Sequence, residues 1–250
     1  SPMARVREIC ECLEQLAPKE LAESWDNVGL LEDCGAEVTS VLVALDITDE
    51  VVAEAELQGC QLIVAHHPVI FKPLRTLAPR HVAFRLVKKN ISAICMHTNL
   101  DAAEGGVNDV LARLFEAEDP EPFGEEGIGG VGSVEPTDAK ALAALCQSRL
   151  NAHVKLVDAG KPIRRLAMVG GSGGSMLADA AAAGADALLT GEASHHGAID
   201  ARAMGLSLIV AGHYSTEFPI VPVLADHLTR RFGGLRVICS RRNKDPFSYL

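Results

Sequence analysis

The chain has 250 residues, of which 48% are hydrophobic and 22% are charged, and its formal net charge is −10 at pH 7. This composition is typical of a folded globular protein, and the length suffices for one large domain or two lobes. The only basic run is the short RRNK near the C-terminus, which argues against a nucleic-acid-binding surface. No segment approaches 18 consecutive apolar residues, so no membrane span is expected.

The start of the chain is amphipathic and acidic, unlike a secretory signal, so we expect a cytoplasmic protein. Ser1 and Pro2 precede Met3 and are interpreted as the remnant of a cleaved expression tag. Seven cysteines are scattered through apolar surroundings. This pattern favours buried free thiols over a disulfide framework.

The first half of the chain alternates helical and extended patterns. An acidic first turn and a late glycine mark one helix, and β-branched apolar runs mark the strands. In chain order the predicted elements are a helix at 3–16, a loop at 24–30, a strand at 38–47, a helix at 49–60, a strand at 61–67, a helix at 78–90, a strand at 91–97 and a helix at 105–117. This alternation predicts βαβ units with a largely parallel sheet.

The segment 116–136 is rich in glycine, proline and acidic residues and is interpreted as a linker. Thr137 is a plausible N-cap for a helix at 138–150, and 153–157 is predicted to be a short strand. We interpret 119–160 as a linker with a small α+β element, and nothing in it suggests catalysis.

The last third of the chain repeats the order of the first. The predicted elements are a strand at 164–170, a helix at 174–185, a strand at 186–192, a helix at 195–205, a strand at 206–217 and a helix at 219–233. Segment 41–67 aligns with 166–192, although any two βαβ segments share some likeness. We predict an α/β fold of two similar lobes, 3–118 and 161–250, related by internal duplication, with a metal site in the cleft between them.

Polar residues gather where the predicted strands end, which is where ligands bind in parallel α/β sheets. Imidazole and carboxylate groups four residues apart at such ends suit zinc, manganese, iron or similar divalent ions. Helix capping or bonding to the backbone is the alternative reading. The residues concerned are His66, His67, His97, Asp101, Glu192, His195, His213 and Glu217.

Adjacent side chains at a strand end are expected to diverge, so His66 and His67 would each serve a different one of two ions. Pro68 restricts the backbone of His67 and would hold that divergence. Two ions roughly 3.5–4 Å apart need bridging carboxylates, and Asp101 and Glu217 are the candidates.

Three further features carry weaker signals. The glycine-rich turn at 169–176 could bind an anion through Gly171, Ser172 and Gly173, or could be a plain tight turn. Glu192 and His195 could carry protons, support a ligand, or cap a helix. Asp26 and its neighbour Asn27 could hydrogen-bond across the cleft or form an Asx turn.

Five blocks of sequence in order, SWDNVGL, AHHPVIF, HTNLDAAEGGVND, TGEASHH and GHYSTE, resemble the dinuclear-metal proteins labelled GTP cyclohydrolase 1 type 2 homologs, in the NGG-interacting-factor group. The resemblance runs from about residue 5 to the C-terminal DPF. It implies two similar α/β lobes around a two-metal site and a ring-shaped homohexamer. The implied ligands are His66, His67, Asp101, His213 and Glu217, with His97 as a further candidate. Longer members carry an extra domain between the lobes, which this chain lacks.

Two functions are consistent with these features. The first is a metal-dependent hydrolase with two divalent ions per chain, acting on a small molecule such as GTP or another phosphoester. His97, Glu192 or His195 would then move protons. The second is a non-catalytic metal-binding ring that acts as an interaction scaffold or a metal carrier.

Overall fold

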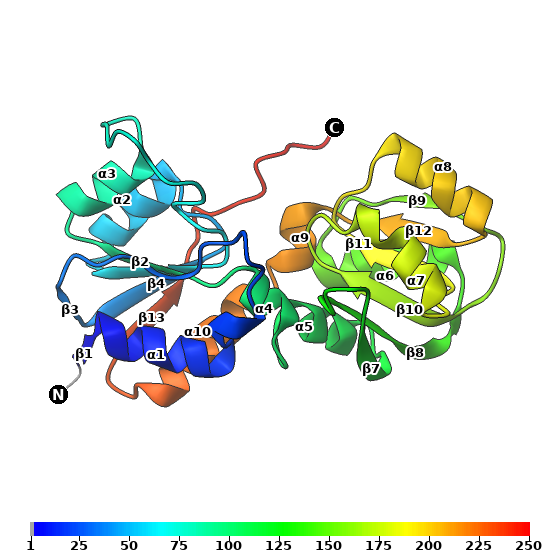
Figure 1. Cartoon of the computed structure of the whole chain (residues 1–250), viewed down its shortest axis with the longest axis horizontal. Coiled ribbons are helices and arrows are strands. Elements are labelled where there is room, and N and C mark those ends of the chain that lie inside the picture. Colours follow the sequence, from blue (N-terminus) through cyan, green and yellow to red (C-terminus); the bar gives the residue numbers. More distant parts are fainter. Residues whose placement is uncertain (1–2) are drawn as a thin grey trace. The chain divides into compact units, whose positions relative to one another are not determined.

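The computed structural model describes residues 3–250, so the interpretation of Ser1 and Pro2 lies outside the described residues. The chain divides into two compact units (Figure 1). The first comprises the residues up to Glu104 together with Ile220–Lys244, and the second comprises Gly105–Pro219 and Asp245–Leu250. Each unit combines helices with a sheet whose central strands are parallel, which confirms the predicted α/β class.

The first unit is built on a five-stranded sheet in the order β13-β4-β5-β6-β2. Its three central strands and β13 run parallel, and β2 pairs antiparallel with β6 at one edge. A short antiparallel pair, β1 and β3, stands apart from this sheet. The elements are β1 (Ala4–Arg5), α1 (Val6–Leu16), a 3-10 turn (Lys19–Leu21), β2 (Gly29–Glu32), β3 (Glu37–Val38), β4 (Ser40–Ala44), α2 (Asp49–Leu57), β5 (Leu62–Ala65), α3 (Val82–Lys88), β6 (Ser92–Cys95), α4 (Thr98–Ala102), α10 (Ile220–Arg231) and β13 (Arg236–Cys239).

Strands β4, β5 and β6 are buried along their whole length, because helices cover both faces of the sheet. Successive side chains of a strand point to opposite faces. Leu42 and Ile63 therefore pack with Val51 of α2 and Leu86 of α3 on one face. Figure 1 shows α2 and α3 together over that face. Thr48 fixes the start of α2 by accepting a hydrogen bond from the Val51 amide.

The second unit is built on a six-stranded sheet in the order β7-β8-β10-β11-β12-β9. Strands β10, β11 and β12 are parallel, whereas β8 and β9 flank them in antiparallel pairs. The elements are α5 (Val107–Leu114), β7 (Glu118–Phe123), β8 (Gly129–Thr137), α6 (Ala139–Leu150), β9 (Lys155–Val157), β10 (Ile163–Val169), a 3-10 turn (Gly174–Met176), α7 (Leu177–Ala182), β11 (Ala187–Thr190), α8 (His195–Met204), β12 (Ser207–Val210) and α9 (His213–Glu217).

Alternate residues of β10 feed two separate apolar cores in the second unit. Leu166 and Met168 pack on the side of α5 and α6, whereas Ala167 and Val169 pack on the side of α7 and α8. The order β10-α7-β11-α8-β12 matches β4-α2-β5-α3-β6 of the first unit. Each unit thus contains the strand and helix order that the sequence repeat predicts.

Three local predictions differ from the structure. Segment 116–136, interpreted as a linker, contains most of the antiparallel hairpin of β7 and β8, which joins the sheet through β10. The N-cap of α6 is Asp138, not Thr137, because its carboxylate accepts a hydrogen bond from the Ala141 amide at 2.8 Å. The strand predicted at 206–217 ends at Val210, and α9 begins at His213.

The compact units differ from the predicted lobes in the residues they contain. Helix α10 and strand β13 lie in the first unit, although the repeat would place them with the C-terminal lobe. Helix α5 lies in the second unit although it follows the first repeat. The segment 119–160 contributes strands to the second unit's own sheet.

All seven cysteines are free, and five of them are buried, which confirms the predicted thiols. Burial raises the pKa of the Cys95 thiol to about 12 and that of Cys146 to about 12. Among residues 3–250, no helix has both the length and the apolar character needed to cross a bilayer.

Candidate metal centre

Three parallel strands of the first unit bring polar side chains to their carboxyl ends. Asp46 follows β4, His66 and His67 follow β5, and His97 follows β6. Asp101 lies one turn along α4, which begins directly after His97. The prediction that His66, His67, His97 and Asp101 gather at one edge of a sheet is confirmed, and Asp46 joins them.

His66 is fully buried, and its two ring nitrogens have different surroundings. Nδ1 lies 2.7 Å from the carbonyl oxygen of Met96. A carbonyl can only accept, so Nδ1 carries the proton and Nε2 presents a lone pair in the neutral ring. That Nε2 lies 3.3 Å from Oδ1 of Asp101, which is also an acceptor. Two facing acceptors are stabilised by a cation between them, and a divalent metal fits this donor set.

His67 and His97 are oriented in the same way by carboxylates. Nδ1 of His67 donates to Oδ1 of Asp46 at 2.6 Å, and Nδ1 of His97 donates to Oδ1 of Asp26 at 2.9 Å. In both rings Nε2 is left as the lone-pair atom. A carboxylate or carbonyl on the second nitrogen is the usual support for a metal-binding histidine, because it fixes the tautomer and the ring orientation.

Asp26 is held in its ionised form by its neighbours. Burial alone would raise its pKa, but hydrogen bonds from Thr98 and His97 outweigh burial and hold the pKa below its ordinary value. The Thr98 hydroxyl donates to Asp26 at 2.6 Å and the Thr98 amide at 3.0 Å. The sequence left the role of Asp26 open, and within the first unit it orients His97.

The three histidine rings of the first unit form one cluster. The ring centroids of His66 and His67 are 5.0 Å apart, and His97 lies 5.4 Å and 5.7 Å from them. His66 and His67 offer ligand atoms within 4.8 Å of each other. The predicted divergence of these two side chains is therefore wrong, because the rings turn toward a common side.

The second unit brings His213 and Glu217 together on α9. The two residues are four apart on one helix face, and Nε2 of His213 lies 2.5 Å from Oε1 of Glu217. Nδ1 of His213 lies 3.3 Å from Oε2 of Glu192, which follows β11. His213 thus stands between two carboxylates, and Glu217 is 3% exposed.

Glu192, predicted to carry protons, is bound on one side by Ser172 and on the other by His213. The Ser172 hydroxyl donates to Oε2 of Glu192. This hydrogen bond is the main reason that the pKa of Glu192 lies below its ordinary value, since it outweighs burial, and His213 adds to it. An ionised Glu192 is suited to orienting His213.

The glycine-rich turn uses its amides within the second unit. The Gly171 amide donates to the Thr216 hydroxyl at 3.0 Å, and the Gly173 amide donates to the Thr190 hydroxyl at 2.9 Å. With the Ser172 hydroxyl directed to Glu192, these bonds support the reading of a tight turn rather than an anion site. The turn also passes close to α9, since a Cβ on Gly171 would lie 2.9 Å from Oε2 of Glu217.

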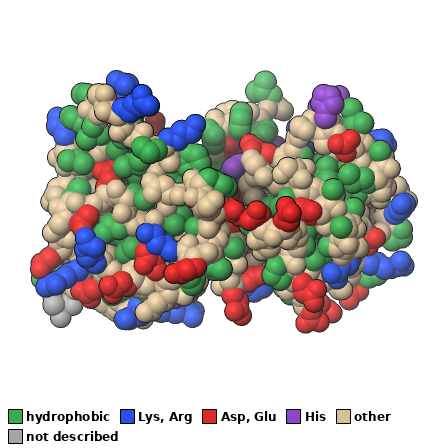
Figure 2. All heavy atoms as spheres, in the orientation of Figure 1, with side chains coloured by type: hydrophobic (Ala, Val, Ile, Leu, Met, Phe, Trp, Pro, Cys, Tyr) green, Lys and Arg blue, Asp and Glu red, His purple; other side chains and the backbone are tan. Residues whose placement is uncertain are grey.

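His195 begins α8 and is exposed together with His196. The two rings are 5.5 Å apart, and Ser194 caps the helix by accepting from the Gly197 amide. Figure 2 shows histidine side chains at the surface over the start of α8. The proton-carrying role predicted for His195 therefore stays a prediction, and a serine provides the helix cap.

Each unit by itself holds residues of the types that bind metal ions. In the first unit the ligand atoms of His66 and His67 lie within 4.8 Å of each other, and in the second unit His213 and Glu217 lie together on α9. Asp46 was missed by the sequence analysis, although it is the carboxylate that orients His67. Its signal is an aspartate directly after an apolar strand, which is too common to be diagnostic.

Comparison with known proteins gives consistent matches over almost the whole chain. Residues 4–246 match the family described as Duf34/NIF3 (NGG1p interacting factor 3). A GTP cyclohydrolase 1 type 2 homolog of Clostridium perfringens is 33% identical, with 98% of this chain and 100% of the relative covered. A protein of Helicobacter pylori named GTP cyclohydrolase 1 type 2 is 36% identical, with 90% and 92% covered. The crystal structure of a hypothetical protein of Staphylococcus aureus matches with a TM-score of 0.88 and 31% identity, covering 98% of this chain and 99% of the other.

Proposed function

Since the chain belongs to the Duf34/NIF3 family, we propose that it is a metal-dependent hydrolase that binds two divalent ions per chain. The observation that carries the proposal is the orientation of the histidines. In His66, His67 and His97 a carbonyl or carboxylate takes the Nδ1 proton, which leaves each Nε2 as a lone-pair atom. Three histidines prepared in this way are typical of metal ligands.

We propose that both units contribute ligands to this dinuclear centre. The first unit would supply His66, His67, His97 and Asp101, and the second would supply His213 and Glu217. Asp101 and Glu217 are the candidates to bridge, because carboxylates have two oxygens and histidines serve one ion each. His97 is better suited to a ligand than to a proton carrier, since Asp26 fixes its tautomer. The ligand set proposed is His66, His67, His97, Asp101, His213 and Glu217.

The chemistry of hydrolysis follows from this ligand set. Divalent ions held by these residues would supply hydroxide near neutral pH, because a bound divalent ion lowers the pKa of water. Glu192 keeps His213 in place through its Nδ1, and Asp46 does the same for His67. His195 is the remaining candidate to carry protons, because it is exposed and takes no part in the hydrogen bonds that orient the ligands.

The substrate proposed is a nucleotide or a related phosphoester. Support comes from the relatives named GTP cyclohydrolase 1 type 2 and their homologs. A homohexamer is proposed from the family resemblance, and light scattering that returns six times the chain mass of 26.5 kDa would support it.

A non-catalytic scaffold or metal carrier is the second candidate function. The observation that favours it is the number of prepared ligands. Six protein ligands fill more of the coordination positions of two ions than five ligands do. A metal site with no open coordination position is structural, not catalytic.

Metal analysis tests the proposal directly. Protein purified without chelator and reconstituted with zinc or manganese should hold two ions per chain. Asp101→Asn and Glu217→Gln should each lower occupancy at both positions, whereas the exposed His153→Ala should not. One ion or none in the parent protein would overturn the dinuclear proposal. Turnover of GTP or of phosphodiesters by the loaded parent, lost in Asp101→Asn, would decide for the hydrolase over the scaffold.

A further inference from the structure

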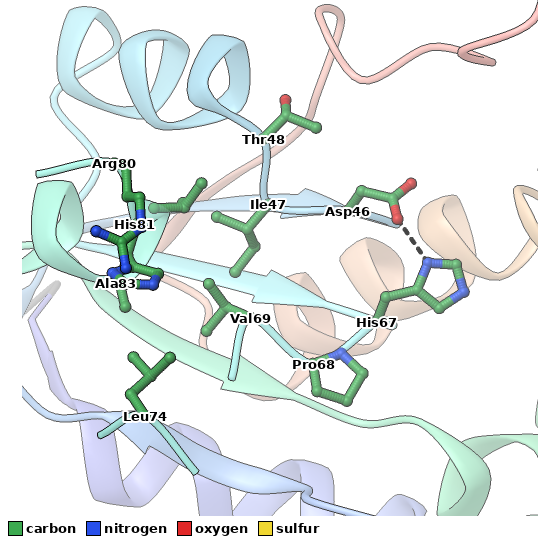
Figure 3. A pocket seen from close by; sticks show the side chains of 11 residues that line it. Asp46, Ile47, Thr48, His67, Pro68, Val69, Leu74, Arg80, His81 and Ala83 are labelled. Atoms are coloured by element: carbon green, nitrogen blue, oxygen red, sulfur yellow. Dashed lines mark hydrogen bonds and ion pairs between the residues drawn. The ribbon is translucent and has the colours of Figure 1, made fainter. Parts of the chain in front are cut away.

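A cavity of about 390 Å³ lies beside His67, entirely within the first unit (Figure 3). This volume falls at the lower end of the range of small-molecule sites, roughly 300–1,000 Å³. Its lining comes from the ends of β4 and β5 and from the loop that leads into α3. In Figure 3 the Asp46–His67 pair lies on one side, and Arg80 and His81 lie together on the other.

The lining includes hydrogen-bond donors, Arg80 and His81 on the side away from His67 and Thr48 beside Ile47 (Figure 3). His81 accepts the Ala78 amide on Nδ1 at 3.2 Å, so its neutral ring carries the proton on Nε2 and can donate it. Thr48 accepts the Val51 amide on its hydroxyl oxygen, which leaves the hydroxyl proton available to donate. Arg80 adds a planar fork of permanent donors.

Arg80 is an exposed side chain without a carboxylate partner among residues 3–250, as are Lys72 and Arg75 of the same loop. Arg85 pairs with Asp49 and Lys89 pairs with Glu56, whereas no acidic group among the described residues 3–250 pairs with Arg80. A guanidinium beside a cavity, without an acidic partner, matches the geometry of carboxylate and phosphate groups. This side of the cavity therefore selects for an anion.

The sequence around the cavity is positive in an otherwise acidic chain. Between Glu56 and Asp101 there are six Lys or Arg residues and no Asp or Glu, although the whole chain carries a net charge of −10. Figure 2 shows Lys and Arg side chains gathered over α3 and the loop before it. Such a local field attracts anions to the cavity.

The middle of the cavity is apolar. Ile47 and Val69 lie between His67 and the side of Arg80 and His81, and Leu74 lines the cavity on the latter side (Figure 3). Asp46 is the acidic residue of the lining, and its Oδ1 accepts a hydrogen bond from Nδ1 of His67. Nε2 of His67 is then the ring atom that we propose for the metal centre. A ligand that fills this space has an oxyanion at one end, a small apolar or planar body, and a second end at His67.

We propose that this cavity binds the oxyanion group of a small organic anion, a phosphate monoester or a carboxylate, with Arg80 as the principal anion ligand and His81 and Thr48 as additional donors. The placement of the ligand's other end at the metal centre rests on the proposed function. Binding of the oxyanion itself does not, because its donors all belong to the first unit and none is a proposed metal ligand.

Calorimetry on the metal-free full chain tests this site. The probes are phenyl phosphate and benzoate, and the variants are Arg80→Gln and Arg75→Gln. Arg75 is a matched control, because it is an exposed cation of the same loop that does not line the cavity. We expect Arg80→Gln to weaken binding at least about 10-fold, as for loss of a hydrogen bond to a charged group, and Arg75→Gln to change it less than about 2-fold.

The outcomes separate this inference from the proposed function. Equal effects of the two substitutions, or no binding of either probe below about 10 mM, would overturn the anion site even if metal analysis finds two ions. Conversely, anion binding that depends on Arg80 in a protein that binds no metal would support the anion site and contradict the proposed function. Tighter binding of phenyl phosphate identifies a phosphate ester as the ligand class, and tighter binding of benzoate identifies a carboxylate.

Discussion

At the residue scale, Glu32 is a buried carboxylate outside the proposed metal centre. It ends β2, is 8% exposed, and neither carboxylate oxygen has a hydrogen-bond partner among the described residues 3–250. Burial raises its pKa from 4.5 to about 7. The folded state therefore binds this proton more tightly than the unfolded state does, and its free energy of unfolding falls as the pH rises from about 4.5 to about 7.

We predict that Glu32→Gln removes this loss of stability. A shift of one pKa unit corresponds to about 1.36 kcal/mol. The free energy of unfolding therefore falls by at most about 3 kcal/mol, and the full loss is reached above pH 7. The variant should therefore be more stable than the parent at pH 8 and close to it at pH 5, as measured by urea unfolding. Glu37→Gln, an exposed change on β3, controls for net charge. A Glu32→Gln effect of the same size at both pH values would contradict the prediction.

Single residues could be predicted from the sequence where their type conflicted with the local pattern. Two adjacent histidines at the end of an apolar strand were such a conflict, and both lie in the histidine cluster. Asp46 could not be singled out, because its role depends on a hydrogen bond to His67, 21 residues away. Arg80 was missed for a similar reason, since only the folded loop brings it to the same cavity as Thr48 and His67.

At the element scale, the turn between β10 and α7 packs against the ligands on α9. Gly171 has φ +72°, and a Cβ there would lie 2.9 Å from Oε2 of Glu217 and 3.1 Å from Nε2 of His213. We predict that Gly171→Ala displaces both side chains and lowers metal occupancy. Elemental analysis of the variant after reconstitution measures the effect.

Gly35 supplies a matched control for this substitution. It has the same φ of +72°, but a Cβ there would meet nothing within 4 Å. Gly35→Ala and Gly171→Ala should both lose about 1 kcal/mol of stability from the backbone strain alone. Only Gly171→Ala should also lose metal, and full metal content in that variant would show that α9 can shift without releasing its ligands.

Elements were predictable where apolar periodicity was strong and were not where it was weak. The buried strands β4, β5, β6 and β11 lie within the predicted ranges, and β10 begins one residue before its predicted range. Strand β7 was taken for a linker because proline and acidic residues dominate it, and five of its six residues are exposed. Its structure comes from pairing with β8, a tertiary effect that overrides local propensity.

At the scale of the whole molecule, the sequence repeat indicated two similar halves but could not assign the helix that follows each repeat. Helix α5 belongs to the second unit and α10 to the first, so the chain passes between the units after α4, after α9 and a third time after Lys244. The first two crossings follow the short helices that carry the proposed ligands Asp101 and Glu217. Periodicity describes each helix face by itself and does not determine which sheet that face covers.

A metal centre that takes ligands from both units makes a thermodynamic prediction. Ions that bind the folded chain and not the unfolded chain stabilise it by about 2.7 kcal/mol at a concentration 100 times their Kd. For a chain of this size, each kcal/mol corresponds to roughly 2–4 °C in Tm. The melting temperature should therefore rise by about 5–10 °C on loading with zinc or manganese, as measured by calorimetry with and without metal.

The test of a shared centre is whether substitutions in different units add. His67→Ala in the first unit and Glu217→Gln in the second should each remove most of the rise in Tm on metal loading, and the double variant should remove little more than either one. Comparing each variant with its own metal-free form cancels the direct effect of the substitution on folding. His153→Ala should keep the full rise. Residues that serve separate sites give additive losses. Two single variants that each lose about half of the rise, with the double variant losing all of it, would therefore assign one independent metal site to each unit.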